Sequence, residues 1–188
     1  MAKLLDNKHF KFRTNMVRLS YANLDKPSET EINKGKYSVS VLIPKSDVET
    51  VDLIENLAAT IIKEEKNGKF KGKNIQPGVY KFLKDGDIER PGDEAYKGHY
   101  FFNTKSEQKP NLFDKYGNPI SQEGEIYSGC YALVIANLYA FNQAGNFGIA
   151  SGLYGVKKVK EGEPLSGGSC TADDFGDETF EDDDDFFN

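Results

Sequence analysis

One segment of the chain carries the pattern of a long α-helix. Leu53, Ile54, Leu57, Ile61 and Ile62 follow one another at helical spacing. The preceding Ser46-Asp47-Val48-Glu49 fits a capping box with Ser46 as the N-cap and Glu49 at N3, and Gly68 is expected as the C-terminal stop. We therefore predict one helix over about residues 46–66, whose apolar stripe packs against a sheet.

The remaining sequence up to about residue 160 has the pattern of short β-strands. In residues 10–24 the alternation of apolar and polar side chains slips near Met16, which indicates a bulged or strongly bent strand. Residues 37–43 alternate cleanly and are followed by Pro44. Further strands are expected over residues 98–106, 111–114, 126–141 and 147–159. Because both faces are apolar from Tyr131 to Ala140, we predict that this strand is central and buried on both sides.

This order of elements restricts the fold class. Strands and helices do not alternate along the chain, which argues against a parallel nucleotide-binding sheet. We predict a mostly β fold: an OB-fold-like small β-barrel of five to six strands with one inserted α-helix. OB-folds bind single-stranded nucleic acid or oligosaccharide on an open face. The barrel domain is expected to span residues 1–160, followed by a flexible linker (161–172) and a disordered acidic tail (173–188).

The formal net charge of −6 is unevenly distributed along the chain. Residues 173–188 contain nine acidic side chains, four phenylalanines and no lysine or arginine, which leaves the preceding body at about +3. Such an acidic run cannot fold alone, and its aromatic residues are typical of a docking peptide. The residues expected to bind partner proteins and to compete with nucleic acid are Phe175, Phe180, Asp182, Asp183, Asp184, Asp185, Phe186 and Phe187.

No motif predicts an enzyme. The sequence lacks a phosphate-binding glycine-rich loop and a dinucleotide fingerprint. The two histidines and two cysteines do not have the spacing of a zinc site, so we expect no catalytic residue, no metal and no cofactor. Without a signal peptide or a membrane-spanning segment, the expected location is the cytoplasm, with no membrane partner.

Lysines and aromatic residues are interleaved in three clusters, at residues 63–84, 96–109 and 154–160. Cations neutralise phosphates, and aromatic rings stack on bases whatever their identity. This combination indicates binding of single-stranded nucleic acid. The candidate stacking residues are Tyr37, Tyr100, Phe102, Tyr139 and Tyr154. The candidate phosphate contacts are Arg13, Lys36, Lys81, Lys105, Lys109, Lys157 and Lys158.

Three segments resemble a known family: GHYFFNTKSEQKPNLFD (98–114), IYSGCYALVIANLYAFN (126–142) and GIASGLYGVKKVKEGEPL (148–165). They are similar to the tailed-phage single-stranded DNA-binding proteins, a family long catalogued as a domain of unknown function. The resemblance implies an OB-fold body with an acidic, aromatic C-terminus. It also implies a role in phage DNA replication and recombination in the bacterial cytoplasm, with a polymerase, helicase or nuclease as the partner of the tail.

Other hypotheses remain open from the sequence. A protein-interaction or DNA-mimic protein would bind a basic partner through the tail, and its body would show no salt-dependent affinity for oligothymidine. A structural phage component would form large assemblies without DNA. A nuclease is disfavoured because no ordered carboxylate cluster with a partnering lysine or histidine is evident. The sequence does not distinguish a monomer from a homodimer.

Overall fold

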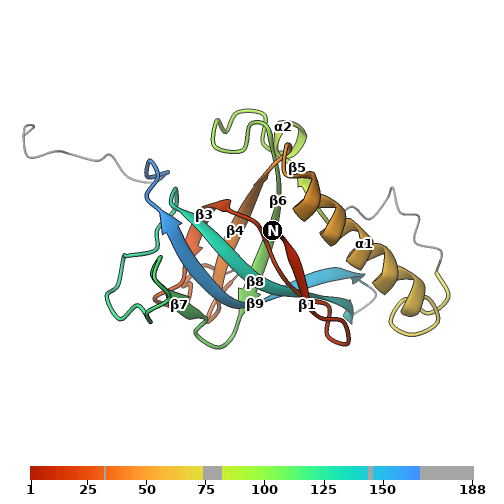
Figure 1. The fold of residues 1–188 in the computed structure, drawn as a ribbon. Coiled ribbons are helices and arrows are strands. Elements are labelled where there is room, and N and C mark those ends of the chain that lie inside the picture. Colours follow the sequence, from red (N-terminus) through yellow and green to blue (C-terminus); the bar gives the residue numbers. More distant parts are fainter. Residues whose placement is uncertain (32, 74–81, 144–145, 166–188) are drawn as a thin grey trace, which may run out of the picture.

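The computed structural model describes residues 1–31, 33–73, 82–143 and 146–165 (Figure 1). Its strands and helices are β1 (Lys3–Asp6), β2 (Lys11–Arg13), β3 (Val17–Asn23), β4 (Tyr37–Pro44), α1 (Val48–Glu64), β5 (Lys84–Asp85), α2 (Gly86–Glu89), β6 (His99–Ser106), β7 (Asn111–Phe113), β8 (Tyr131–Gln143) and β9 (Asn146–Lys160). The described helices include none that is long and apolar enough to cross a membrane.

Five of these strands close into a ring in the order β3-β4-β6-β9-β8 and back to β3. All pairs in the ring are antiparallel except β6–β9, which is parallel. A five-stranded Greek-key barrel is the architecture of the OB-fold, so the predicted fold class is confirmed. The other strands extend the ring, because β1 and β2 continue the sheet beyond β8, while β7 pairs with β9 and β5 with β6.

The predicted bent strand at residues 10–24 is present as two strands, β2 and β3. Both pair with β8, β2 at residues 135–137 and β3 at residues 131–132. Thr14 in the break keeps the two segments in line, because its backbone N–H donates to Val134 O and its Oγ1 accepts from Val134 N–H, both at 3.0 Å. The slip in the alternation therefore marks the break between β2 and β3, and the chain continues along the same partner strand, β8, after the break.

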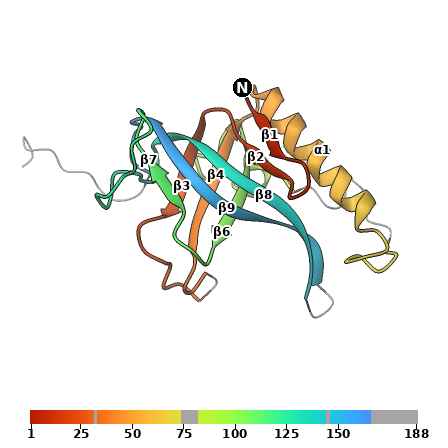
Figure 2. The same cartoon turned by 60° about the horizontal axis from the view of Figure 1, so that its bottom comes forward.

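The main core fills the barrel and the space under α1. Its side chains come from β2, β3, β4, β6, β8, β9 and α1, and they include Phe12, Leu19, Val41, Ile54, Leu57, Ile61, Phe102, Val134, Leu138 and Val156. Figure 1 shows α1 along one side of the barrel, whereas the long strands β8 and β9 form part of the barrel wall. Figure 2 shows the end of β8 and the start of β9 extending past the barrel, and Asn142 Nδ2 donates there to Lys69 O at 2.7 Å.

The caps of α1 differ from those predicted. The N-cap is Asp47, whose side chain accepts from Thr50 N–H at 3.2 Å, because a turn between Pro44 O and Asp47 N–H leaves Ser46 outside the helix. The helix ends at the C-cap Glu65, and the predicted stop at Gly68 is wrong. The helix itself, at Val48–Glu64, lies within the predicted range of 46–66.

The prediction that β8 is buried on both sides is also wrong. Ala132, Val134, Ala136 and Leu138 are buried, but the intervening residues are only partly buried and Tyr139 is 42% exposed. A strand in the wall of a closed barrel has one face in the core, and no layer of the described structure covers the other face of β8. The outer face of β8 carries the partly buried Leu133 and Ile135 and the exposed Tyr139, which is why the sequence of the strand is apolar on both faces.

Candidate nucleic-acid interface

A row of four paired residues crosses the outer surface of the barrel. Lys11 on β2 pairs with Asn137 on β8, Asn137 pairs with Gly152 on β9, and Gly152 pairs with Lys105 on β6. Phe12, next to Lys11, points into the core, so Lys11 projects outward. A cationic side chain thus lies at each end of a short neutral stretch of sheet.

Two exposed tyrosines flank this row. Tyr139 and Tyr154 are each 42% exposed. Tyr154 is the extra residue of a β-bulge, since Ile135 pairs with Gly155 and Ala136 with Leu153. Bulges re-aim side chains, and this one turns the Tyr154 ring outward between two core residues of β9. The Lys11 ammonium lies 4.4 Å from the centre of the Tyr154 ring, in a cation–π contact.

Gly152 keeps the middle of the row flat. Asn137 Oδ1 accepts a hydrogen bond from Gly152 N–H at 3.0 Å. A Cβ at position 152 would lie 2.5 Å from this oxygen and 3.9 Å from Cε1 of Tyr139. Any larger residue at position 152 would therefore displace the Asn137 side chain, so glycine is the residue that lets Asn137 Oδ1 lie close to the backbone of β9.

A hollow of about 320 Å³ opens beside the row. It is lined by Ser106, Gln108, Lys109, Pro110, Asn111, Asn137, Gly152, Leu153 and Tyr154. This lining combines amide and hydroxyl groups with one lysine and one aromatic ring, and none of its residues is acidic. We call the row, the two tyrosines and this hollow the tyrosine face. It offers stacking surfaces, hydrogen-bonding groups and positive charge on one side of the barrel.

Comparisons with known proteins place the chain in a family. The family model for the single-stranded DNA-binding protein of Enterobacter phage Enc34 matches residues 10–187. The chain belongs to this family. The resemblance recognised in the three sequence segments is therefore confirmed.

The chain is also similar to individual known proteins. The solved structure of the bacteriophage Enc34 single-stranded DNA-binding protein in complex with ssDNA has a TM-score of 0.71 and 25% identity, covering 85% of this chain and 91% of that one. The gp2.5 single-stranded DNA-binding protein of bacteriophage T7 shares the fold, with a TM-score of 0.61 and 18% identity over 92% and 96% of the two chains. Protein p50 of Acyrthosiphon pisum secondary endosymbiont phage 1 is 29% identical over 173 residues, which is 86% of this chain and 90% of p50.

The structure of this Enc34-family chain brings four predicted residues to the tyrosine face, namely Tyr139, Tyr154, Lys105 and Lys109. Arg13 lies beside this face, since it pairs with Ile135 on β8. Its Nη2 donates to Met1 O at 2.6 Å, so the guanidinium is partly engaged by the N-terminus. Lys157 lies farther along β9, opposite Leu133 of β8 and Phe113 of β7.

Other predicted aromatic residues are not on this face. Phe102 is 1% exposed, and its ring centre lies 6.2 Å from that of Phe12 and 5.3 Å from that of Phe82. Its prediction as a stacking residue is wrong, because the ring fills the core. Tyr100 is half-buried against the same core, under the Lys45 ammonium at 5.2 Å. Tyr37 is also half-buried; it pairs with Ser106, which lines the hollow, but Tyr37 is not itself part of the lining.

Two predicted lysines are engaged with carboxylates. The Lys158 side chain is only 13% exposed, and its Nζ lies 2.7 Å from Glu161 Oε1. Its partner on β8 is the buried Ala132, so Lys158 does not project from the tyrosine face, and its role as a phosphate contact stays a prediction. Lys36 Nζ is 3.4 Å from Glu107 Oε1. Lys81 and the tail residues, from Phe175 to Phe187, lie outside the described residues.

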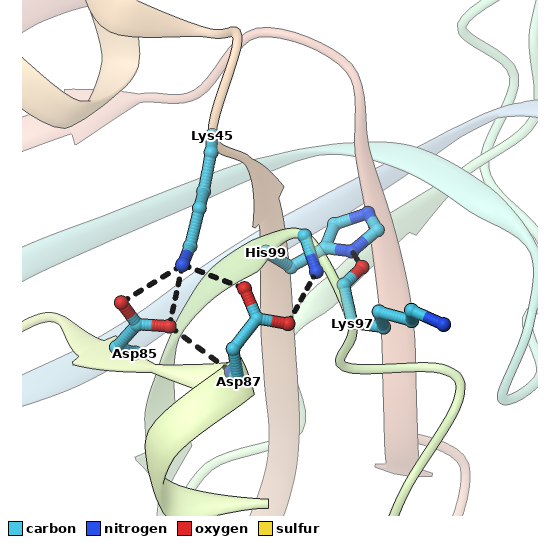
Figure 3. A network of polar contacts seen from close by, with 6 residues as sticks. Lys45, Asp85, Asp87, Lys97 and His99 are labelled. Carbon is cyan, nitrogen blue, oxygen red and sulfur yellow. Dashed lines mark hydrogen bonds and ion pairs between the residues drawn. The ribbon is translucent and has the colours of Figure 1, made fainter. Parts of the chain in front are cut away.

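A second polar cluster lies away from this face, around Lys45 (Figure 3). Lys45 Nζ is 2.7 Å from both Asp85 and Asp87, and these two carboxylates raise the pKa of the ammonium. Lys45, followed by the backbone N–H of Gly98 at 2.9 Å, lowers the pKa of Asp87. The cluster thus ties α2 to the ends of β4 and β6. It is a structural ion-pair network, and the described residues include no group of acidic, histidine or cysteine side chains that could hold a metal.

Sequence reasoning missed Lys11, Asn137 and Gly152. Each is unremarkable locally, because a lysine, an asparagine and a glycine on separate strands form no motif. They are brought together by pairing across β2, β8 and β9. The alternation around Phe12 could have indicated that Lys11 faces outward, but no local signal indicates its neighbours.

Proposed function

We propose that this protein binds single-stranded DNA with little sequence preference and that the tyrosine face is its binding surface. Membership of the Enc34 family supports single-stranded DNA as the ligand. The observation that carries the choice of surface is the row from Lys11 to Lys105 with Tyr139 and Tyr154 beside it. The proposed role is binding rather than catalysis, in phage replication and recombination in the host cytoplasm.

The chemistry of the tyrosine face suits an unpaired strand. Bases stack on the exposed rings of Tyr139 and Tyr154, an interaction worth about 1–3 kcal/mol per base that does not depend on base identity. Lys11, Lys105 and Lys109 neutralise phosphates and release bound counterions. The Asn137 amide lies between the rings and can reach base edges or sugars. Duplex DNA presents no free base faces, so the same surface disfavours it.

The acidic tail has two proposed roles. It competes with DNA for the basic body, and when DNA displaces it, it recruits a replication protein such as a polymerase, helicase or nuclease. Residues 163–165 are held on the barrel, because Arg18 Nη2 donates to Glu163 O at 3.0 Å and Leu165 N–H donates to Ser128 O at 2.9 Å. A short tether from Leu165 gives the tail a local concentration on the order of mM.

A fluorescence titration with single- and double-stranded oligomers over a salt series tests this proposal. The expected results are a preference for oligothymidine over duplex and a linear fall of log affinity with log salt. The chain lacking residues 173–188 should bind more tightly, most clearly at low salt, and unchanged or weaker binding would exclude competition by the tail. A body without salt-dependent affinity would instead favour the protein-interaction or DNA-mimic hypothesis.

A further inference from the structure

The turn after β7 presents the most exposed tyrosine of the described chain, Tyr116, at 77%. Strand β7 runs parallel to β9, with Asn111 opposite Gly155 and Phe113 opposite Lys157. Figures 1 and 2 show β7 beside β9 near one end of the barrel. Asn111 also lines the hollow of the tyrosine face. The turn therefore continues from the proposed binding surface.

Hydrogen bonds to one aspartate hold this turn in a fixed shape. Asp114 Oδ1 accepts from the backbone N–H groups of Tyr116 and Asn118, both at 2.8 Å, and Oδ2 accepts from Asn118 Nδ2 at 2.9 Å. The side-chain bond from Asn118 is the main cause of the lowered pKa of Asp114. Gly117 has φ of +94°, a backbone conformation that glycine adopts without strain. The Tyr116 backbone is thus ordered before any ligand binds, which reduces the entropy lost on binding.

Two lysines lie near the Tyr116 turn, which also holds the Asp114 carboxylate. Lys115 Nζ lies 4.9 Å from the centre of the Tyr116 ring. Lys157 Nζ lies 4.0 Å from the place that a Cβ would occupy if residue 117 were not glycine. Neither lysine forms an ion pair within the described residues. Both ammonium groups are therefore available to phosphates on either side of a stacked base.

Three of the exposed tyrosines lie at successive places along β9. Four tyrosines are exposed in the described chain; Tyr139 is on β8, Tyr154 is on β9 and Tyr116 is in the turn after β7. Tyr139 pairs with Ala150 near one end of β9, whereas the Tyr116 turn lies beyond Lys157 at the other. At about 3.3 Å per residue, this part of β9 is roughly 23 Å long.

We propose that Tyr116 is a further base-stacking residue, with Lys115 and Lys157 as its phosphate contacts, and that it extends the single-strand track along β9. This inference rests on the proposed function. It has a length signature, because a short oligomer held at Tyr139 and Tyr154 does not reach Tyr116, whereas a longer one does.

The test measures the affinity of the full chain for oligothymidines of 4 to 16 nucleotides. Tyr116→Ala should leave the affinity for the shortest oligomers unchanged and weaken binding of the longest by about 5- to 150-fold, as expected for one stacked base. Tyr116→Phe keeps the ring and should bind as the wild type. Lys115→Gln with Lys157→Gln should reduce the salt slope for long oligomers by about 1.4. Tyr21→Ala, at an exposed tyrosine on β3, is the matched control and should have no length-dependent effect.

Three outcomes would overturn the inference while leaving the proposed function standing. The first is a Tyr116→Ala protein that binds every length as tightly as the wild type while Tyr154→Ala loses affinity. The second is a loss that is equal at all lengths, which would indicate a general effect of the turn on the protein. If Tyr116→Ala changes the thermal midpoint, the comparison is made between Tyr116→Phe and Tyr116→Leu, and equal binding by these two at all lengths would also overturn it. A wild type without affinity for any oligomer would instead refute the proposed function.

Discussion

The outer surface of the barrel is covered on β4 and β6 but open on β8 and β9. On the covered side, Leu42 and Phe101 lie under the buried Tyr96, whose ring meets that of Phe101 edge-on at 4.9 Å. Tyr96 Oη also donates to Ser40 Oγ at 3.1 Å, and Leu165 packs against the same cluster. On the open side, Tyr139 and Tyr154 remain exposed with no described segment over them.

The difference shows which aromatic residues serve the fold and which are free for a ligand. In OB-folds, strands 2 and 3 commonly carry the ligand, and these correspond here to β4 and β6. The segment around Tyr96 covers part of that face, and only its margin at Lys105 joins the open side. The proposed binding surface therefore lies on β8 and β9 rather than on β4 and β6.

Removing the cover should have the largest effect on stability. Tyr96→Ala takes away a fully buried ring and should lower the free energy of unfolding by about 3–5 kcal/mol. Because Tyr96 lies on the covered side, the folded variant should keep its affinity for oligothymidine. Urea denaturation gives the stability, and a titration below the unfolding transition gives the affinity. A small loss of stability with a large loss of affinity would show that the covered side binds DNA.

Adding a methyl group at Gly152, on the open side, should have a smaller effect on stability. Gly152→Ala places a Cβ 2.5 Å from Asn137 Oδ1, so the Asn137 side chain must move and lose its bond to the backbone of residue 152. We expect the free energy of unfolding to fall by about 1 kcal/mol and the affinity for oligothymidine to fall with it. Gly92→Ala is the matched control, because no atom lies within 4 Å of its added Cβ. Equal behaviour of the two variants would contradict the role assigned to Gly152.

The smallest effect concerns one phosphate contact. Lys105→Gln should reduce the slope of log affinity against log salt by about 0.7, with little change in stability, because one fewer phosphate is neutralised. Lys26→Gln removes a lysine that is paired with Glu123 at 2.8 Å in the loop after β3, and it should leave the slope unchanged. The same change of slope in both variants would show that Lys105 is not a specific phosphate contact.

The sequence was sufficient for the longer elements but not for the short ones or for strand partners. Periodicity predicted α1, the longer strands and the interruption near Met16, since these depend on neighbours within a few residues, but it did not predict β1, β5 or α2. The pairing of Lys11 with Asn137 and of Gly152 with Lys105 joins residues far apart in the chain, and it depends on closure of the ring. For the same reason Phe102 was misplaced. Aromatic residues occupy both faces of β6, and only the closed barrel decides which of them is inside.

Base stacking on Tyr139 and Tyr154 is tested by comparing three proteins. Oligothymidine binding is measured at fixed salt for the wild type, for Tyr139→Ala with Tyr154→Ala, and for Tyr21→Ala on β3. If both rings stack on bases, the double variant folds normally and loses about 1–3 kcal/mol of binding free energy for each ring, while Tyr21→Ala binds as the wild type. A double variant that binds as tightly as the wild type would contradict this stacking.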